Sequence, residues 1–293
     1  MTIAHTNTKR VLVVGASGML GNAVFRLFSQ SPGYKAFGSV RSSAARRLLP
    51  IGLQDNIITG VNVENIDRLI NLFSVVRPDI VINCVGLVKQ MVDSDDPLAT
   101  IPINALLPHQ LARLCKVSHA RLVHLSTDCI FSGTKGGMYT ESDTSDATDL
   151  YGRSKYLGEV DYPHAITLRT SIIGHELEGT RSLVDWFLSQ EVSVKGFKRA
   201  IFSGLPTVEV ARVIRDQVIP HPELHGLYHL SASPINKFEL LGLVAEIYGK
   251  SIKIIADETL VIDRSLNSER FRHATGFFPK PWPQLISSMH DFG

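Results

Sequence analysis

The sequence predicts an α/β fold, built as a doubly wound parallel sheet with a smaller, partly interleaved α/β lobe. Short apolar runs alternate with amphipathic segments as far as residue 174, which is typical of a parallel sheet covered by helices on both faces. Glycines spaced three apart join the first apolar run to the first helix. Several later runs end in polar residues, at the edge where such sheets bind ligands.

The composition is that of a soluble globular protein, with 44% hydrophobic and 20% charged residues in a chain of 293. A net charge of +2 demands neither nucleic acid nor an anionic membrane as a partner, and no apolar run approaches a bilayer-spanning length. Residues 1–9 are polar, so we expect a flexible tail and no secretory signal. The three cysteines form no C-x-x-C pair, which favours reduced thiols and a cytoplasmic location. A homodimer is an open alternative to a monomer.

The first element is the apolar strand Val11–Val14, which leads through Gly15, Gly18 and Gly21 into a helix that extends to Phe28. The first glycine permits the sharp turn, the second lets a pyrophosphate approach the backbone, and the third lets the helix pack closely on the sheet. A tight turn between two core elements is the plainer interpretation. The strand before and the helix after favour a Rossmann-like dinucleotide site, because the helix N-terminus attracts phosphate.

The second strand, Tyr34–Val40, ends at Arg41, where an acidic residue would hold the ribose of NAD. No Asp or Glu follows before Asp55, and the segment instead carries Arg41 with Ser42 and Ser43. A guanidinium and hydroxyls suit a 2′-phosphate, so NADP(H) is preferred over NAD(H). We interpret Arg46 and Arg47 as solvated charges at the start of a helix.

The remaining elements of the first half continue the alternation. The expected strands are Ile57–Val61, Asp79–Val85 and Ala120–Leu125, and the expected helices are Ile66–Val76 and Leu98–Cys115, the latter interrupted at Pro108. Because the strand ends gather at one edge, we expect cofactor contacts there and in the glycine turn. Besides the glycines and Arg41, the candidates are Ser17, Met19, Leu20, Asn62, Val63, Cys84, Val85 and Gly86.

The second half begins with a long polar loop, Phe131–Thr148, whose length beside the strand ends is typical of a functional lid. The helix Tyr151–Asp161 and the strand Ala165–Ile173 follow, and the regular alternation then stops. We therefore expect a cofactor-binding domain over 10–174 and a substrate-binding lobe over 175–293, with segments at about 205–231 returning to the first domain. The expected helices and strands of the lobe are Leu183–Ser189, Val208–Ile219, Lys237–Tyr248, Leu227–Leu230 and Ile252–Ile255.

Tyr151 and Lys155 lie four residues apart on a predicted helix, so their side chains share a face. An ammonium group near a phenol stabilises the phenolate and lowers its pKa from about 10. Thr127, at the end of a central strand, could add a hydroxyl to the same site. This set suits reduction of a ketone, in which nicotinamide gives the hydride, Tyr151 the proton and Thr127 a hydrogen bond.

With these motifs in place, the chain resembles the extended short-chain dehydrogenase/reductase superfamily, and most closely its dTDP-4-dehydrorhamnose reductase branch. The resemblance spans Val11 to about Phe271. Its carrying motifs are Gly15-x-x-Gly18-x-x-Gly21, Ser126-Thr127-Asp128, Tyr139-x-Glu141-x-Asp143, Tyr151-Gly-Arg-Ser-Lys155, Gly158-Glu159, Leu168-Arg169-Thr170-Ser171, Gly204-Leu-Pro206-Thr207 and Arg264-Ser-Leu-Asn267-Ser268.

The resemblance implies a catalytic set of Thr127, Tyr151 and Lys155, with Lys155 also binding the nicotinamide ribose. It implies a nucleotide-diphosphate sugar bound between two lobes and a role in surface polysaccharide biosynthesis. The sequence predicts no metal-ligating residue and leaves open whether a metal assists. Candidates for the diphosphate are Lys195, Lys198, Arg199 and Arg264, and Trp186 could line the sugar pocket or belong to a helix core.

Two departures from the branch bear on the substrate. Cys129 stands where the rhamnose reductases usually have Tyr and the related 4,6-dehydratases have Glu, which argues against dehydration. Ala200–Ser203 lacks the usual acidic and amide residues, so a UDP-linked 4-keto-6-deoxyhexose is as good a candidate as a dTDP-linked one. An epimerase of the same superfamily and a non-catalytic subunit, like the regulatory subunit of methionine adenosyltransferase, are the alternatives.

Overall fold

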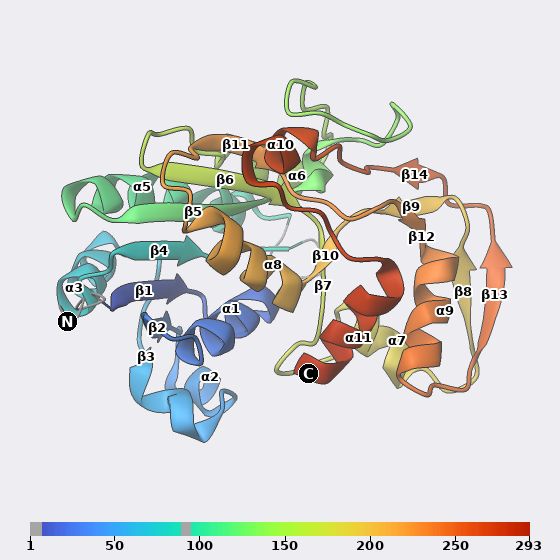
Figure 1. Cartoon of the computed structure of the whole chain (residues 1–293), viewed down its shortest axis with the longest axis horizontal. Helices are drawn as coiled ribbons and strands as arrows, with labels where there is room; N and C mark the ends of the chain where they lie inside the picture. Colours follow the sequence, from blue (N-terminus) through green and yellow to red (C-terminus); the bar gives the residue numbers. More distant parts are fainter. Residues whose placement is uncertain (1–7, 89–94) are drawn as a thin grey trace, which may run out of the picture.

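A seven-stranded, entirely parallel sheet forms the centre of the computed structural model, which describes residues 8–88 and 95–293 (Figure 1). Its order, β3-β2-β1-β4-β5-β6-β11, extends the Rossmann order by one strand, so the predicted fold class is confirmed. The strands are β1 (Lys9–Val14), β2 (Tyr34–Ser39), β3 (Ile57–Ile58), β4 (Ile80–Asn83), β5 (Arg121–Thr127), β6 (Ala165–Thr170) and β11 (Gly226–His229).

Two hydrophobic cores lie on opposite faces of the sheet because successive side chains of a strand point in opposite directions. In β1, Val11 and Val13 belong to one core while Leu12 and Val14 belong to the other. The first core is covered by α1 (Met19–Ser29), α8 (Thr207–Val213) and α11 (Trp282–Phe292), and the second by α3 (Ile66–Val76) and α5 (Leu107–Val117).

Capping residues set several helix boundaries near the site. The Asn65 side chain accepts hydrogen bonds from the N–H groups of Asp67 and Arg68 at the start of α3. Asp149 accepts from the N–H of Gly152, at 2.7 Å, at the start of α6 (Leu150–Leu157). This cap fixes where α6 begins and therefore where Tyr151 is placed.

Short strand pairs and helices make up most of the second half, on the right of Figure 1. This part also returns to the sheet, since α8 packs on α1 and β11 pairs with β6. Its other elements are β7 (Ile172–Ile173) with β10 (Leu205–Pro206), β8 (Ser193–Phe197) with β13 (Lys253–Asp257), β9 (Ala200–Phe202) with β12 (Ile235–Asn236) and β14 (Ile262–Asp263), and α7 (Leu183–Ser189), α9 (Lys237–Ile247) and α10 (Glu269–Thr275).

Several predicted boundaries need correction. The third strand stops at Ile58, and the strand predicted to run to Ile173 divides into β6 and β7. The long helix divides into α4 (Pro97–Ile101), a π-helical turn at Pro102–Leu106 and α5, because prolines cannot donate to the helical ladder. Lys9, predicted to lie in the tail, is the first residue of β1; residues 1–7 of that tail lie outside the described residues.

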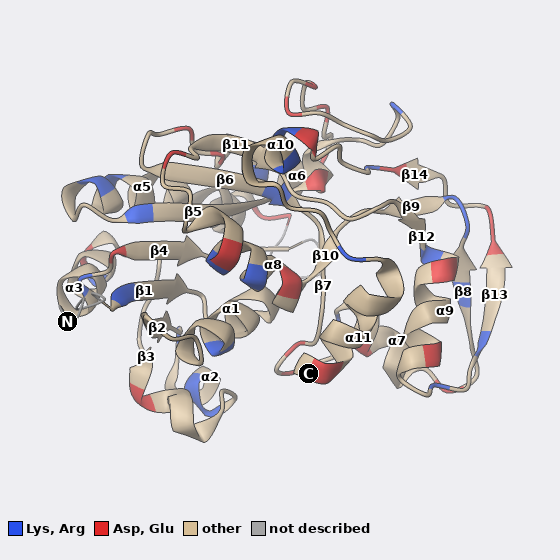
Figure 2. Ribbon diagram, viewed as in Figure 1, with Lys and Arg blue, Asp and Glu red and all other residues tan. Residues whose placement is uncertain are grey.

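In Figure 2, basic and acidic residues are interspersed along the described ribbon. Of the helices in the described ranges, none combines the length and apolar character that a bilayer crossing requires.

Candidate active site

The glycine turn after β1 requires its glycines. Gly15 has φ +87°, and a Cβ there would lie 2.7 Å from Cγ2 of Val85. A Cβ at Gly21 would lie 2.0 Å from the carbonyl oxygen of Gly15, so only glycine lets α1 approach the turn this closely. The two glycines thus fix the position of the start of α1 beside the end of β4.

The N-terminal end of α1 suits a dinucleotide phosphate. Gly18 at the N-cap offers no side-chain cap, and the first turn contains no acidic residue. The first N–H groups and the positive end of the helix dipole therefore remain available to an anion. Ser17, Met19 and Leu20 lie at this end of the helix, so the residues present fit a pyrophosphate, and their contacts with a cofactor stay predictions.

Arg41 lies just beyond β2, beside the glycine turn, because β1 and β2 pair in parallel from Lys9–Tyr34 to Val14–Ser39. The side chain of Arg41 is exposed. Arg46 instead approaches Asp55, with a guanidinium-to-carboxylate distance of 3.7 Å, and Ser42 caps α2 (Ser43–Arg47) by accepting from the N–H of Ala45. Arg41 is thus exposed beside the glycine turn, and its predicted role in binding a 2′-phosphate stays a prediction.

The other predicted cofactor residues follow neighbouring strands. Asn62 and Val63 come after β3, and the Asn62 side chain accepts from the N–H of Glu64 at 3.1 Å. After β4, the N–H of Cys84 donates to the carbonyl of Val14 at 3.0 Å. Burial raises the pKa of the Cys84 thiol to about 12, although nearby Lys155 opposes this shift. The thiol is therefore neutral at physiological pH.

Thr127 and Tyr151 are brought together at the carboxyl end of β5. The Thr127 hydroxyl accepts from the N–H of Cys129 at 3.1 Å and donates to Asp128 at 3.2 Å. The Tyr151 phenol lies close enough to Thr127 for this hydroxyl to oppose the rise of the Tyr151 pKa. The two hydroxyl groups therefore lie close together, so that both could hold the same carbonyl oxygen.

The prediction that Lys155 lowers the pKa of Tyr151 needs correction. Burial raises the pKa of the Tyr151 phenol above its ordinary value, and the neighbouring Cys129, Asp128 and Asp149 add to the rise while Thr127 opposes it. A raised pKa keeps the phenol protonated at neutral pH, which is the form that a proton donor needs.

Lys155 points its ammonium at the backbone of β5 and donates to the carbonyl of Leu125 at 2.6 Å. The side chain is buried, and this burial lowers its pKa to about 8, while Glu159 and Cys84 oppose the shift. A Cβ at Gly86 would lie 3.9 Å from Nζ of Lys155. The ammonium thus faces the loop after β4, where a nicotinamide ribose is expected.

Arg264 lies beside the catalytic strand end although it is far away in sequence. Its Nη1 is 3.5 Å from Sγ of Cys129. Burial raises the pKa of the Asp128 carboxyl, and Arg264 opposes that rise. Of the predicted substrate residues other than Thr127, Arg264 is the one whose contacts lie at this strand end.

Trp186 and Lys198 lie in the second half. Trp186 is on α7, which packs against α9, and 38% of its side chain is exposed. Lys198 follows β8 and places its ammonium 5.7 Å from the ring centre of Phe238. The roles predicted for these two side chains stay predictions.

Asn104 is a structural residue of the site that the sequence analysis missed. It is buried in the π-helical turn, where its side chain accepts from the N–H of Leu87 at 2.9 Å and donates to Ser154 at 3.2 Å. It therefore joins the loop after β4 to α6 between Tyr151 and Lys155. The prolines at 102 and 108 were the available signal, since irregular helical turns often mark functional positions.

The polar loop predicted as a lid is anchored at its centre. The N–H of Tyr139 donates to the carbonyl of Ser265 at 2.8 Å, and the N–H of Asn267 donates to the carbonyl of Tyr139 at 2.7 Å. The Tyr139 ring stacks on Phe131 with a centroid distance of 4.1 Å. This anchor fixes the loop to the segment that carries Arg264.

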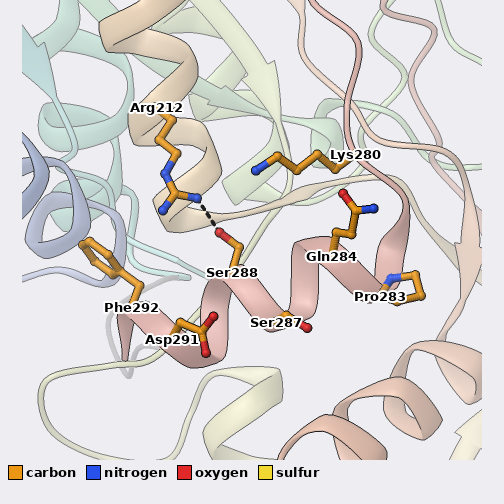
Figure 3. Close-up of a pocket in the computed structure, with 8 residues that line it drawn as sticks. All are labelled: Arg212, Lys280, Pro283, Gln284, Ser287, Ser288, Asp291 and Phe292. Carbon is orange, nitrogen blue, oxygen red and sulfur yellow. Dashed lines mark hydrogen bonds between the residues drawn. The ribbon is translucent and has the colours of Figure 1, made fainter.

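A surface pocket of about 510 Å³ lies between α8 and α11, away from the catalytic set (Figure 3). Its main cation, Arg212, is already bound to Glu209 and Ser288. A second cavity, of about 200 Å³, adjoins the start of α1 at Met19 and is closed by His175, Thr207 and Phe292. The hydrogen-bonded geometry around Tyr151, and not the larger pocket, identifies the candidate site.

Comparisons with known proteins agree with this geometry. The family described as RmlD substrate binding domain matches residues 9–282. The chain is 28% identical over 211 residues to the probable low-salt glycan biosynthesis reductase Agl14 of Haloferax volcanii, covering 71% of this chain and 64% of that protein's length. It is 27% identical over 259 residues to methionine adenosyltransferase 2 subunit beta of Danio rerio, covering 83% of this chain and 75% of that one.

Among solved structures, the dTDP-4-dehydrorhamnose reductase of Bacillus anthracis str. Ames in complex with NADP is similar over 97% of this chain and 99% of that one. The TM-score is 0.78 and the sequence identity 20%. This likeness concerns the fold.

Proposed function

The chain belongs to the RmlD substrate binding domain family, and from that premise we propose that it reduces the 4-keto group of a nucleotide-linked 6-deoxyhexose with NADPH. The sugar nucleotide is dTDP- or UDP-linked in this proposal. The observation that carries it is the placement of the Thr127 and Tyr151 hydroxyls together at the end of β5, where the buried ammonium of Lys155 donates to the carbonyl of Leu125.

Each side chain has a distinct task in the proposed reaction. The bound nicotinamide supplies the hydride. Thr127 and Tyr151 hold the ketone oxygen, and Tyr151 gives its proton to the oxygen as charge develops there. Lys155 binds the cofactor ribose, and Arg264 stands close enough to the catalytic strand end to bind the substrate diphosphate.

A panel of dTDP-, UDP- and GDP-linked 4-keto sugars, assayed for NADPH consumption, tests the proposal. Turnover of at least one sugar nucleotide supports it. NADPH binding without turnover of any would instead favour a non-catalytic role, as the similarity to methionine adenosyltransferase 2 subunit beta suggests. A cofactor that stays bound through turnover would favour an epimerase.

Arg41→Ala should weaken NADPH binding by about 1.5–3 kcal/mol, the scale of a hydrogen bond to a charged group. NADH binding should change much less, because NADH has no 2′-phosphate. Fluorescence titration with both cofactors measures the difference, and Arg47→Ala serves as a control on the neighbouring basic helix. Equal losses for NADPH and NADH would remove Arg41 from the 2′-phosphate site.

Thr127→Val should lower kcat roughly 10²-fold, as for the loss of one donor to a developing oxyanion. The variant keeps the shape of the side chain and removes the hydroxyl that contacts Tyr151. Thr127→Ser keeps the hydroxyl and should retain most of the activity. If Thr127→Ser were as impaired as Thr127→Val, packing rather than the hydroxyl would explain the loss.

A further inference from the structure

A buried ion pair lies behind the catalytic lysine. The Glu159 carboxylate accepts from Ser126 at 2.7 Å and from Nε and Nη2 of Arg169 at 2.7 and 2.6 Å. Only 10% of the Glu159 side chain and 3% of the Arg169 side chain are exposed. Burying two charges costs free energy unless the two groups are well aligned with each other. The bidentate contact therefore indicates that the side chains of Glu159 and Arg169 are held in one arrangement.

The far side of Arg169 is fixed as well. Its Nη1 lies 3.2 Å from Nε2 of His229, whose Nδ1 lies 3.0 Å from the carbonyl oxygen of Tyr139. Burial and Arg169 lower the pKa of His229 to about 3, so the ring is neutral; Nδ1 donates to Tyr139 and Nε2 accepts from Arg169. Glu159 is therefore held from β5, β6 and β11 together.

Neighbouring residues of β5 bring the carboxylate and the lysine to one place. Lys155 donates to the carbonyl of Leu125, and the next residue, Ser126, donates to Glu159. Glu159 also follows Lys155 by four residues, just after the end of α6. Adjacent residues of β5 thus hold the ammonium and the carboxylate, and the bidentate contact with Arg169 fixes the carboxylate in place.

We propose that Glu159 is a positioning residue of the site, which keeps the Lys155 side chain charged and directed at the cofactor end of β5. This inference rests on the proposed reductase function. A purely structural role, in which the ion pair only joins α6 to β6, is the competing explanation, and the pH dependence of the site separates the two.

The charges around Lys155 determine the direction in which its pKa should move when the Glu159 carboxylate is removed. Burial lowers the pKa of Lys155 to about 8, and Glu159 is the largest opposing influence. Cys84 from β4 opposes the shift more weakly, while His124 from β5 stays neutral because its own pKa is far below the ordinary value. Without the carboxylate, the ammonium should therefore lose its proton at a lower pH.

Glu159→Gln keeps the hydrogen bond with Ser126 and removes the charge. In NADPH titrations from about pH 6 to 9, its affinity should match the parent's within about twofold at pH 6 and fall below it by about fivefold at pH 8 and about ninefold at pH 9, the effect of a shift near one pKa unit. The alkaline limb of kcat/KM should move to lower pH by the same amount. An unchanged pH dependence in both measurements would overturn the inference.

Glu141→Gln is the matched control, because Glu141 accepts from the N–H of His229 in the same array but does not flank Lys155. It should leave both pH profiles unchanged, and a shift equal to that of Glu159→Gln would show that loosening the array is sufficient. If Glu159→Gln does not fold, the double variant Glu159→Gln/Arg169→Gln, which leaves no unpaired buried charge, should shift in the same direction. Failure of the parent itself to bind NADPH would contradict the proposed function instead.

Discussion

Tyr151→Phe should lower turnover of a validated 4-keto nucleotide-sugar by about 10³-fold or more, within the range that a positioned general acid contributes. The variant keeps the ring and its packing and removes the proton that the phenol would give. NADPH affinity should stay within about twofold of the parent's. Steady-state kinetics together with NADPH titration measures both quantities.

The matched control is Tyr156→Phe, five residues further along the same helix, where the residue is 46% exposed. It should leave kinetics and stability close to the parent's. Near-parental turnover of Tyr151→Phe would show that the phenol is not the proton donor. The protein would then use another acid or serve as a non-catalytic subunit.

The central sheet could be predicted from the sequence because apolar residues mark its main strands. β1 and β4 are apolar along most of their length, β5 contains a shorter apolar segment, and the side chains of all three are mostly buried. The glycine spacing between a strand and a helix likewise identified the turn after β1. The backbone conformation of this turn depends on residues that are neighbours in the sequence, so it could be predicted locally. The two-residue strands β7 and β10 have no such signal, since each exists only through pairing with the other.

The site was less predictable than the fold. The spacing of Tyr151 and Lys155 predicted a shared helix face, but not that Lys155 would turn to the carbonyl of Leu125. Burial then raises the pKa of the phenol where the sequence suggested a lower one. Contacts such as Arg264 with Cys129, or Asn104 with Ser154, join residues far apart in sequence, and only the fold brings them together.

Lys155→Met should impair both cofactor binding and turnover. Methionine preserves an unbranched side chain of similar length but cannot donate to the carbonyl of Leu125 or to a ribose hydroxyl. NADPH affinity should fall by about 1.5–3 kcal/mol, the scale of a charged hydrogen bond, and turnover should fall further. Loss of turnover with full NADPH affinity would remove Lys155 from the ribose site.

Lys155 also determines whether NADPH affinity and kcat/KM rise or fall with pH. The pKa of Lys155 is about 8, so the ammonium is present below this pH and is lost above it. In the parent, NADPH affinity and kcat/KM should therefore decline as pH rises through about 8, while Tyr151, with its raised pKa, stays protonated there. Lys155→Met should lack this decline in NADPH affinity, and its persistence in the variant would assign it to another group.

Stability should respond in the opposite direction. The folded-state pKa of Lys155, about 8, lies below the ordinary 10.5, so between these values the unfolded chain binds more protons than the folded one. The free energy of unfolding of the parent, relative to Lys155→Met, should therefore rise from about pH 8 to about pH 10. Urea unfolding of both proteins across this range measures the slope, and a falling difference would mean that the fold stabilises the buried ammonium instead of penalising it.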